Sequence, residues 1–479
     1  MFDNNFLLKR KNKNNCKCNL FILRYIFFMI IICCMLFSNQ TAEKLSRQLN
    51  IYNSEIRLII KGKGIQYFLY KNFSFNPSEI IVNGQSIKNT LNKNYKFNED
   101  TNNITLIFNQ QINTCEKMFF QLFNIIEIDL SGFDTSKVTS FDSMFYNCSN
   151  LKELNFGNIN TSSLENMNKT FVSCKNLTFI DLSKFDISKV KYMMYMFYNC
   201  TKLVEINFGD INTSSVEYIH SLFYKCESLL SLDLSKFDTS KVTDMGWMFF
   251  RCYSLKSITF SKIFNTSNVK LMNSMFSHCT ELFTLDLSYF DVSNVYNMSF
   301  MFRNCEKLLS LDLSNFSPLK MGSITYMFFE CRSLLYLNLK KFIIYSWTEK
   351  EYVFYNTPNY LIICNRDSEL KKLLSSKQLN CSNICFKKNS KIGLTRRQCI
   401  EKCYDVNYEF SNICYSRCPQ NTYVSETNTQ ICLDKAPEGF YLDLKSKKYK
   451  KCYQNCKYCY GEGKMNIIIV LNVNIIIYF

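Results

Sequence analysis

The chain has 479 residues, of which 47% are hydrophobic and 20% charged, and it contains 24 cysteines. A hydrophobic fraction of this size excludes a disordered chain and allows a large buried core. The net charge of +17 would indicate a nucleic-acid partner if Lys and Arg clustered with aromatic residues on one face. Much of the excess instead lies in the first 24 residues and between residues 387 and 451, so we expect no nucleic-acid binding.

Residues 1–42 have the composition of an export signal. Basic residues up to Arg24 precede 25-YIFFMIIICCMLF-37, an uncharged run followed by polar residues. The run has the length of a signal-peptide core and is shorter than the roughly 20 residues of a membrane-spanning helix. We expect a cleaved signal peptide or, if the segment is retained, a signal anchor. Either one sends the chain through the secretory pathway to the cell surface or the medium, where disulfides persist.

Residues 43–114 carry no repeat. They contain short β-prone segments separated by Asn, Gly and Pro, such as 56-IRLIIKG-62 and 103-NITLIFNQ-110. A repeat array needs a terminal unit with a polar outer face. We therefore predict a small β-rich N-terminal cap.

A repeat occupies residues 115–342. Its marker is a cysteine that returns every 26 or 27 residues, with Phe three residues before it and Leu three residues after it, at Cys148, Cys174, Cys200, Cys226, Cys252, Cys279, Cys305 and Cys331. An earlier copy around Phe119 has Leu122 in place of the cysteine, which gives nine units. A fixed period of this length predicts a solenoid of stacked coils.

The letters of each unit predict a strand followed by a short helix. In 229-LLSLDLSKF-237, Leu232 and Leu234 alternate with polar residues, which indicates a strand with one face inward. The following Asp, Thr and Ser favour the start of a helix. Apolar residues then recur at steps of three and four, which is typical of one helix face. The fold class is therefore an α/β repeat solenoid, and alternate LDLS and NFG copies suggest a doubled unit of 52 residues.

Two columns of the repeat have more than one interpretation. We interpret the cysteines as small core residues, because each coil holds one and offers it no partner; bridges between coils are the alternative. The exposed position inside L-x-L is either a ladder that binds a partner or cations, or a set of side chains that bond their own turns. Its members are Asp129, Asn155, Asp181, Asn207, Asp233, Asp286, Asp312 and Asn338.

The consensus L-x-x-L-D-L-S-x-F-D-T-S-x-V-T-x-M-x-x-M-F-x-x-C resembles the repeat of BspA-like leucine-rich-repeat surface proteins of bacteria and protists. The resemblance covers about residues 115 to 342. It implies a leucine-rich-repeat-like solenoid, export to the cell surface, and a role in adhesion or partner binding. The usual asparagine after L-x-L is Phe or Ile here, as at Phe133 and Ile159. We therefore expect a hydrophobically packed loop and doubt a horseshoe of standard curvature.

The sequence after the repeat changes character. Residues 343–380 keep one strand and one helix and are predicted to form a C-terminal cap, while 381–463 are rich in cysteine and poor in core residues. This composition predicts a disulfide scaffold of unknown connectivity, with Cys381, Cys385, Cys399, Cys403, Cys414, Cys418, Cys432, Cys452, Cys456 and Cys459 as candidates. Zinc is the alternative, although only 456-CKYC-459 has the usual spacing. The region is similar to growth-factor-receptor-type cysteine-rich modules of protist surface proteins.

The apolar end, 464-KMNIIIVLNVNIIIYF-479, is interrupted by asparagines and is a poor membrane span. Our hypothesis is that it is an artefact of the gene model, with further modules or an anchor missing. Membrane attachment would then depend on the N-terminal segment or on such an anchor. Sequons for N-glycosylation occur at several positions, including Asn72, Asn103, Asn168 and Asn176.

The sequence offers no catalytic or cofactor-binding pattern. It has two histidines, His220 and His278, and lacks the phosphate-loop, nucleophile-elbow and zinc-protease motifs. We expect no enzymatic activity, no cofactor and no metal site. The favoured interpretation is a surface or secreted repeat protein that binds a protein or glycan partner. The alternatives are a self-associating coat or matrix protein, or an intracellular scaffold with a zinc-bound tail.

Overall fold

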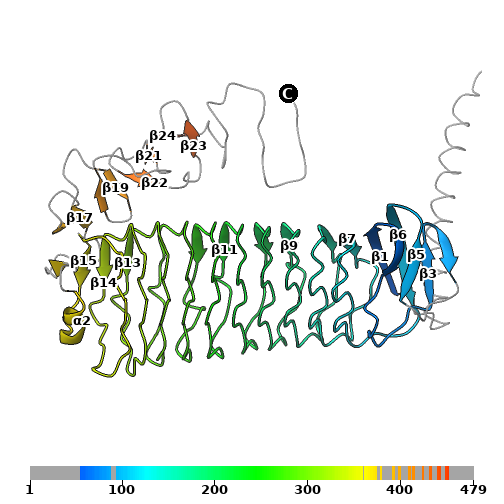
Figure 1. Cartoon of the computed structure of the whole chain (residues 1–479), viewed down its shortest axis with the longest axis horizontal. Helices are drawn as coiled ribbons and strands as arrows, with labels where there is room; N and C mark the ends of the chain where they lie inside the picture. The colour runs from blue at the N-terminus through cyan, green and yellow to red at the C-terminus, as the bar shows by residue number, and fades with distance from the viewer. Residues whose placement is uncertain are drawn as a thin grey trace, which may run out of the picture.

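The computed structural model describes residues 54–87, 93–359 and 361–374, together with short strands between residues 378 and 451. The predicted segments 1–42 and 464–479 and most of the cysteine-rich region lie outside the described residues. About nine coils stack along a nearly straight axis into an elongated solenoid (Figure 1). One hydrophobic core runs through the N-terminal strands and all of these coils.

Four N-terminal strands join the first coils in one sheet of order β4-β3-β6-β1-β7-β8, while β2 and β5 pair with each other in a separate two-stranded sheet. Strand β1 pairs antiparallel with both β6 and β7, and β7 pairs in parallel with the next coil. An open sheet edge would expose unpaired backbone groups, so this pairing protects the start of the array. The strands are β1 (Ser54–Lys61), β2 (Gly64–Tyr67), β3 (Glu79–Val82), β4 (Gln85–Ile87), β5 (Asn94–Phe97), β6 (Thr101–Phe108) and β7 (Ile125–Asp129).

The L-x-L segments of the coils line a parallel sheet face and form three-residue strands, except at 285–287, where no strand is formed. Their middle residues point into the core, as Leu232 and Leu311 do, while the flanking residues are exposed or half-buried, except for the buried Asn338. Parallel pairing is in register, with Ile206 opposite Ile180. The strands are β8 (Glu153–Asn155), β9 (Phe179–Asp181), β10 (Glu205–Asn207), β11 (Ser231–Asp233), β12 (Ser257–Thr259), β13 (Ser310–Asp312) and β14 (Tyr336–Asn338).

The prediction of a short helix in each coil is wrong. The segment that ends at each cysteine is a succession of turns, which together form the turn face opposite the sheet face. Apolar residues at steps of three and four fit such turns as well as a helix. Amide groups here donate along the solenoid axis, as Phe223 does to the carbonyl of Met248 in the next coil at 2.9 Å. The solenoid is thus mostly β and turn, with almost no helix.

Two backbone positions per coil exclude the helix. Both have φ between 53° and 62°, in the left-handed region that a right-handed helix cannot contain. The first column is Lys117, Ser143, Lys169, Tyr195, Ser221, Trp247, Ser274, Phe300, Tyr326 and Tyr352, and the second is Gln121, Asn147, Ser173, Asn199, Lys225, Arg251, His278, Asn304, Glu330 and Asn356.

The Asp-Thr-Ser segments predicted to start helices close turns instead. The Ser240 amide donates to Asp238 Oδ1 at 2.9 Å, which is a turn made by a side chain and its own backbone. The buried Thr239 hydroxyl donates to the carbonyl of Asn265 in the next coil at 2.7 Å. Short polar residues are therefore needed here to satisfy backbone groups within and between coils.

A ladder of stacked phenylalanines forms the centre of the core. Neighbouring ring centroids lie 5.4–5.7 Å apart, with planes within 10° of parallel. The ladder consists of Phe119, Phe145, Phe171, Phe197, Phe223, Phe249, Phe276, Phe302, Phe328 and Phe354. The residues that replace the usual asparagine, such as Phe133 and Ile159, are also buried, so that loop packs hydrophobically.

The eight repeat cysteines are free and fully buried, which confirms the interpretation as core residues. Each thiol also donates to the carbonyl of the ladder Phe one coil back, at 3.0–3.2 Å, as Cys226 does to Phe197. Burial raises the pKa of Cys200 and Cys331 to about 12. The thiols are therefore protonated and unreactive. Cysteine suits this position because its S–H group donates a hydrogen bond and fills more space than the side chain of alanine.

Glycine occurs in alternate early coils because their turns approach the previous coil closely. Gly157 and Gly209 have φ of +56° and +59°. A Cβ at Gly209 would lie 2.8 Å from Cα of Ser183. Only glycine accepts both conditions, which accounts for the 52-residue alternation in the sequence.

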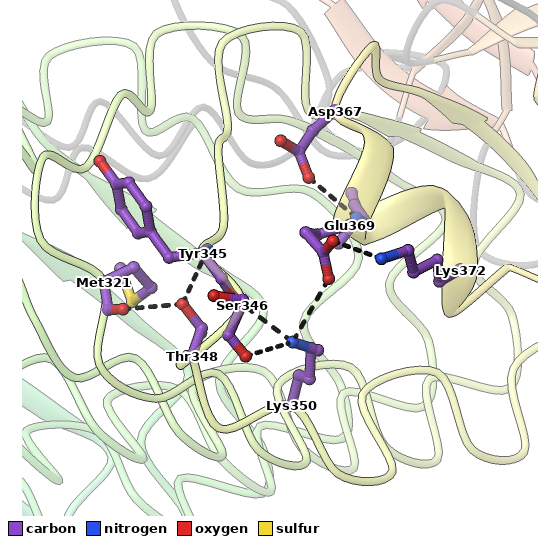
Figure 2. A network of polar contacts seen from close by, with 9 residues as sticks. Met321, Tyr345, Ser346, Thr348, Lys350, Asp367, Glu369 and Lys372 are labelled. Atoms are coloured by element: carbon purple, nitrogen blue, oxygen red, sulfur yellow. Dashed lines mark hydrogen bonds and ion pairs between the residues drawn. The ribbon is translucent and has the colours of Figure 1, made fainter.

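The last coil ends in strand β15 (Ile362–Cys364) and helix α2 (Ser368–Lys372), with β16 (Gln378–Leu379) completing the sheet β13-β14-β15-β16. Figure 2 shows how this end is fixed. Asp367 caps α2 by accepting the Leu370 amide at 2.8 Å. Lys350 lies 3.8 Å from Glu369 and also donates to the carbonyl of Ser346. No helix in the described part of the chain is long and apolar enough to cross a membrane.

Short strands continue into the cysteine-rich region in two sheets of order β18-β17-β20-β19 and β22-β21-β24-β23. They are β17 (Lys391–Gly393), β18 (Gln398–Ile400), β19 (Tyr408–Phe410), β20 (Ile413–Tyr415), β21 (Tyr423–Ser425), β22 (Cys432–Leu433), β23 (Phe440–Asp443) and β24 (Lys448–Lys451). Cys432 is buried and disulfide-bonded. The side chains of the other nine candidate cysteines lie outside the described residues, so the scaffold stays a prediction.

Candidate functional site

The predicted ladder inside L-x-L lies on the sheet face and bonds its own turns. In every member the side-chain Oδ1 accepts the amide two residues later, at 2.9–3.3 Å. Asn155 and Asn207 also donate to the aspartate of the previous coil at 3.0 Å. Asn338 is only 3% exposed. These contacts show that the ladder side chains stabilise the turns and the stacking of the coils. Partner binding by the ladder stays a prediction.

The four predicted glycosylation sites differ in exposure. Asn72 and Asn103 are exposed, while Asn168 and Asn176 are half-buried. The Asn176 amide nitrogen donates to Asn150 at 3.2 Å. Glycosylation of any of them stays a prediction.

The turn face carries columns of aromatic rings that the sequence interpretation did not single out. One column lies two residues before five of the eight cysteines and includes stacked pairs such as Tyr198 and Tyr224, with centroids 4.4 Å apart. A second lies at the first left-handed position, where Phe300 stacks on Tyr326 at 5.0 Å. The rings lie outside the core, and Trp247 is 42% exposed. The recurrent F-[YF]-x-C text at 145–148, 197–200, 223–226, 249–252 and 328–331 is the signal that could have revealed them.

Cations lie against these rings. The guanidinium of Arg251 is 5.3 Å from the Phe250 centroid, and that of Arg303 is 5.1 Å from the Phe329 centroid. Lys225 lies 5.8 Å from the Tyr224 ring. The negative face of an aromatic ring attracts a positive group electrostatically, which holds these cations over the rings. Rings and cations together form an ordered surface along the middle coils.

A histidine–aspartate pair lies on the same face. Nδ1 of His220 is 3.0 Å from Oδ2 of Asp244 in the next coil. Burial, the largest single effect, raises the pKa of Asp244, but the hydrogen bonds from His220 and the Gly246 amide outweigh it and hold the pKa below its ordinary value. No sequence motif indicates this pair, because 24 residues separate its members.

The other histidine lies between two arginines. His278 follows Arg251 by one coil, and Arg303 follows His278 by one coil. Burial, then the charges of Arg303 and Arg251, lower the pKa of His278 to about 4. The imidazole is therefore neutral at pH 7 and can both donate and accept a hydrogen bond.

The described residues hold no group of three or more His, Cys, Asp or Glu side chains arranged to bind a metal ion. A hollow of about 550 Å³ at the sheet face lies over β1, β6, β7 and β8 and is open to solvent.

These features define a class: a repeat protein whose coils form a straight β-solenoid with one sheet face and one turn face. Within that class, a family model described as "Mycoplasma protein of unknown function, DUF285" matches residues 113–229, 180–259, 200–282 and 256–361. The matches together cover about half of the chain, and the protein belongs to this family.

Other similarities are distant. No curated protein matches the chain. One solved structure, "Crystal structure of TLR13-ssRNA13 complex", is 21% identical over 48% of this chain, with a TM-score of 0.23. The match covers 34% of that protein, so this chain spans about a third of its length.

Proposed function

We propose that this protein is a non-enzymatic repeat protein of the cell surface or the medium that recognises a protein or glycan partner through its turn face. The observation that carries the proposal is the surface of ordered rings and cations on that face. Trp, Tyr and Arg dominate the binding energy of interfaces, because they offer large rigid areas and fixed hydrogen-bond donors. Stacked columns lose little side-chain freedom on binding, which favours affinity.

Export is supported by the basic and apolar N-terminal segment and by the cysteine-rich region that follows the solenoid. The buried coil thiols are compatible with an oxidising compartment, since each is fully buried and hydrogen-bonded to a carbonyl. The resemblance to bacterial and protist surface repeat proteins points the same way.

The experiment is a binding assay of the full chain against arrays of glycans and immobilised extracellular proteins. Trp247→Ala tests the turn face, and Phe179→Ala, on strand β9, is the matched control from the sheet face, because both side chains are large and 42% and 48% exposed. We expect at least one binder whose affinity falls about tenfold in Trp247→Ala and is unchanged in the control. Binding that depends on Phe179 alone would refute the assignment to the turn face.

Self-association is the second candidate, and one observation favours it. Phe179, Val204 and Leu230 are exposed by 48%, 37% and 43% in three consecutive coils of the sheet face. Such a patch could pair two copies and give a coat or matrix protein. Sedimentation of the full chain over a hundredfold range of concentration separates the two functions. Assembly that a Val204→Lys and Leu230→Lys variant abolishes would favour the coat.

A further inference from the structure

The ring column two residues before the cysteines is interrupted at Val172 and again at Ser277 and Arg303. Tyr198, Tyr224 and Phe250 precede the second interruption, and rings resume at Phe329. Ser277 is 1% exposed, and its hydroxyl has no hydrogen-bond partner among the described residues. The interruption at Ser277 and Arg303 therefore leaves a polar gap between the rings of neighbouring coils.

Two guanidinium groups at this gap, that of Arg303 within it and that of Arg251 beside it, have unmet hydrogen-bonding capacity. Nε of Arg251 and Nε of Arg303 are buried, and the described part of the chain offers them no acceptor. Within the described residues neither side chain has an ion pair, whereas Arg57 and Arg332 each pair with a glutamate at 2.5 Å. Hydrogen bonds from Arg332 and Asn356 lower the pKa of Glu330, and the charge of Arg303 adds to this effect. The Glu330 carboxylate is therefore already bonded to Arg332 and Asn356 and does not pair with Arg303. The two charges thus remain available to an anion.

The spacing suits a chain that lies along the solenoid axis. Neighbouring strands lie about 4.8 Å apart, so side chains two coils apart are separated by about 10 Å. His278 occupies the coil between the two arginines and touches Phe250 edge to face, with centroids 5.6 Å apart. The order along the axis is cation, neutral imidazole beside a serine, cation.

The rings distinguish between classes of polyanion. Single-stranded nucleic acid binds to successive free ring faces. Here most faces are covered by the next ring, with centroids 4.4–5.1 Å apart in the stacked turn-face pairs. Trp247 differs, because it is tilted by 39–47° from its aromatic neighbours and is 42% exposed. The exposed indole of Trp247 can stack on one sugar ring, while the neighbouring guanidinium of Arg251 binds one acidic group of that sugar.

We propose that the surface from Trp247 to Arg303 binds an acidic glycan along the solenoid axis, with one sulfate or carboxylate group at Arg251 and another at Arg303. Each guanidinium offers paired N–H donors to the oxygens of such a group. The half-buried His278 meets a hydroxyl group between the two charges. This inference rests on the proposed function and specifies the ligand of the same face.

The test is calorimetric titration of the full chain with dextran sulfate, carboxymethyl dextran and uncharged dextran. The variant is Arg251→Gln with Arg303→Gln. The control, Arg57→Gln with Lys63→Gln, removes the same two charges from the N-terminal cap, where both are exposed and ion-paired. Unchanged circular dichroism and melting temperature verify folding, and Arg251→Lys with Arg303→Lys retains the charge without the paired donors.

We expect at least one acidic dextran to bind, with affinity reduced tenfold or more in the glutamine variant, less in the lysine variant and not at all in the control. The dextran that binds identifies sulfate or carboxylate as the group. Equal loss in variant and control would overturn the site, because binding would then follow net charge. Tighter binding of oligo-deoxythymidine or polyglutamate would overturn the glycan. If only uncharged array ligands bind through Trp247, this inference fails while the proposed function stands.

Discussion

Replacing Phe223 with leucine should destabilise the solenoid more than the same replacement of Phe119. Both side chains are fully buried, so the loss of buried apolar area is similar. Phe223 stacks on Phe197 at 5.5 Å and on Phe249 at 5.6 Å, whereas Phe119 begins the ladder and stacks on Phe145 alone, at 5.7 Å. An aromatic pair contributes about 0.5–1.5 kcal/mol beyond its buried area. The leucine at position 223 should therefore cost about 1 kcal/mol more.

Hydrogen exchange is the suitable assay, because a stack of coils need not unfold in a single step. The amides of Phe223 and Phe119 each donate to the next coil at 2.9 Å, so each reports the opening of its own coil. A difference of about 1 kcal/mol is about a fivefold difference in exchange protection. Equal loss of protection in the two variants would show that ring stacking adds nothing to burial.

Three further predictions concern single positions. Gly209→Ala should lower the free energy of unfolding by more than about 2 kcal/mol. Gly64→Ala should lower it by only about 1 kcal/mol, because Gly64 has positive φ but no atom within 4 Å of the added Cβ. Urea titrations of both variants test this difference. Ser221→Gly should raise the melting temperature, because it relieves a left-handed φ of 55° and removes a buried hydroxyl that has no partner among the described residues, and Ser221→Val should lower it. The pKa of His278, about 4, lies below its ordinary value of about 6.5, so the unfolded chain takes up the proton first and stability should fall as the pH drops from 6.5 to 4. Melting curves of His278→Gln should lack this fall, and an equal fall in the variant would contradict the assignment.

The period of the array was predictable, and the local structure of each coil was only partly so. Leu232 and Leu234 predict a strand because only an extended backbone turns every second side chain to the same face. Val242, Met245 and Met248 do not distinguish a helix from a run of turns, since both place every third or fourth residue inward. The missing information was the left-handed backbone at positions such as Trp247 and Arg251, where large residues give no turn signal.

The candidate site was harder to predict than the fold. Arg251 and Arg303 occupy different columns of the repeat, one and two residues before their cysteines, and the step from Cys252 to Cys279 has one extra residue. Only the stacking of the coils places His278 between these two arginines. The L-x-L ladder is the most regular polar column in the sequence, but its Oδ1 atoms bond their own turns.

Export of a solenoid with free, buried thiols is tested most directly by differential alkylation of the protein from its own cell, with mass spectrometry of every cysteine before and after reduction. We predict that the tail thiols from Cys381 to Cys459 are oxidised. The column from Cys148 to Cys331, whose members are buried and whose pKa values are raised by burial, should be reduced and react only after unfolding. Reduced tail thiols would place the protein in a reducing compartment and contradict recognition outside the cell. Oxidised column thiols would contradict the structure of the coils.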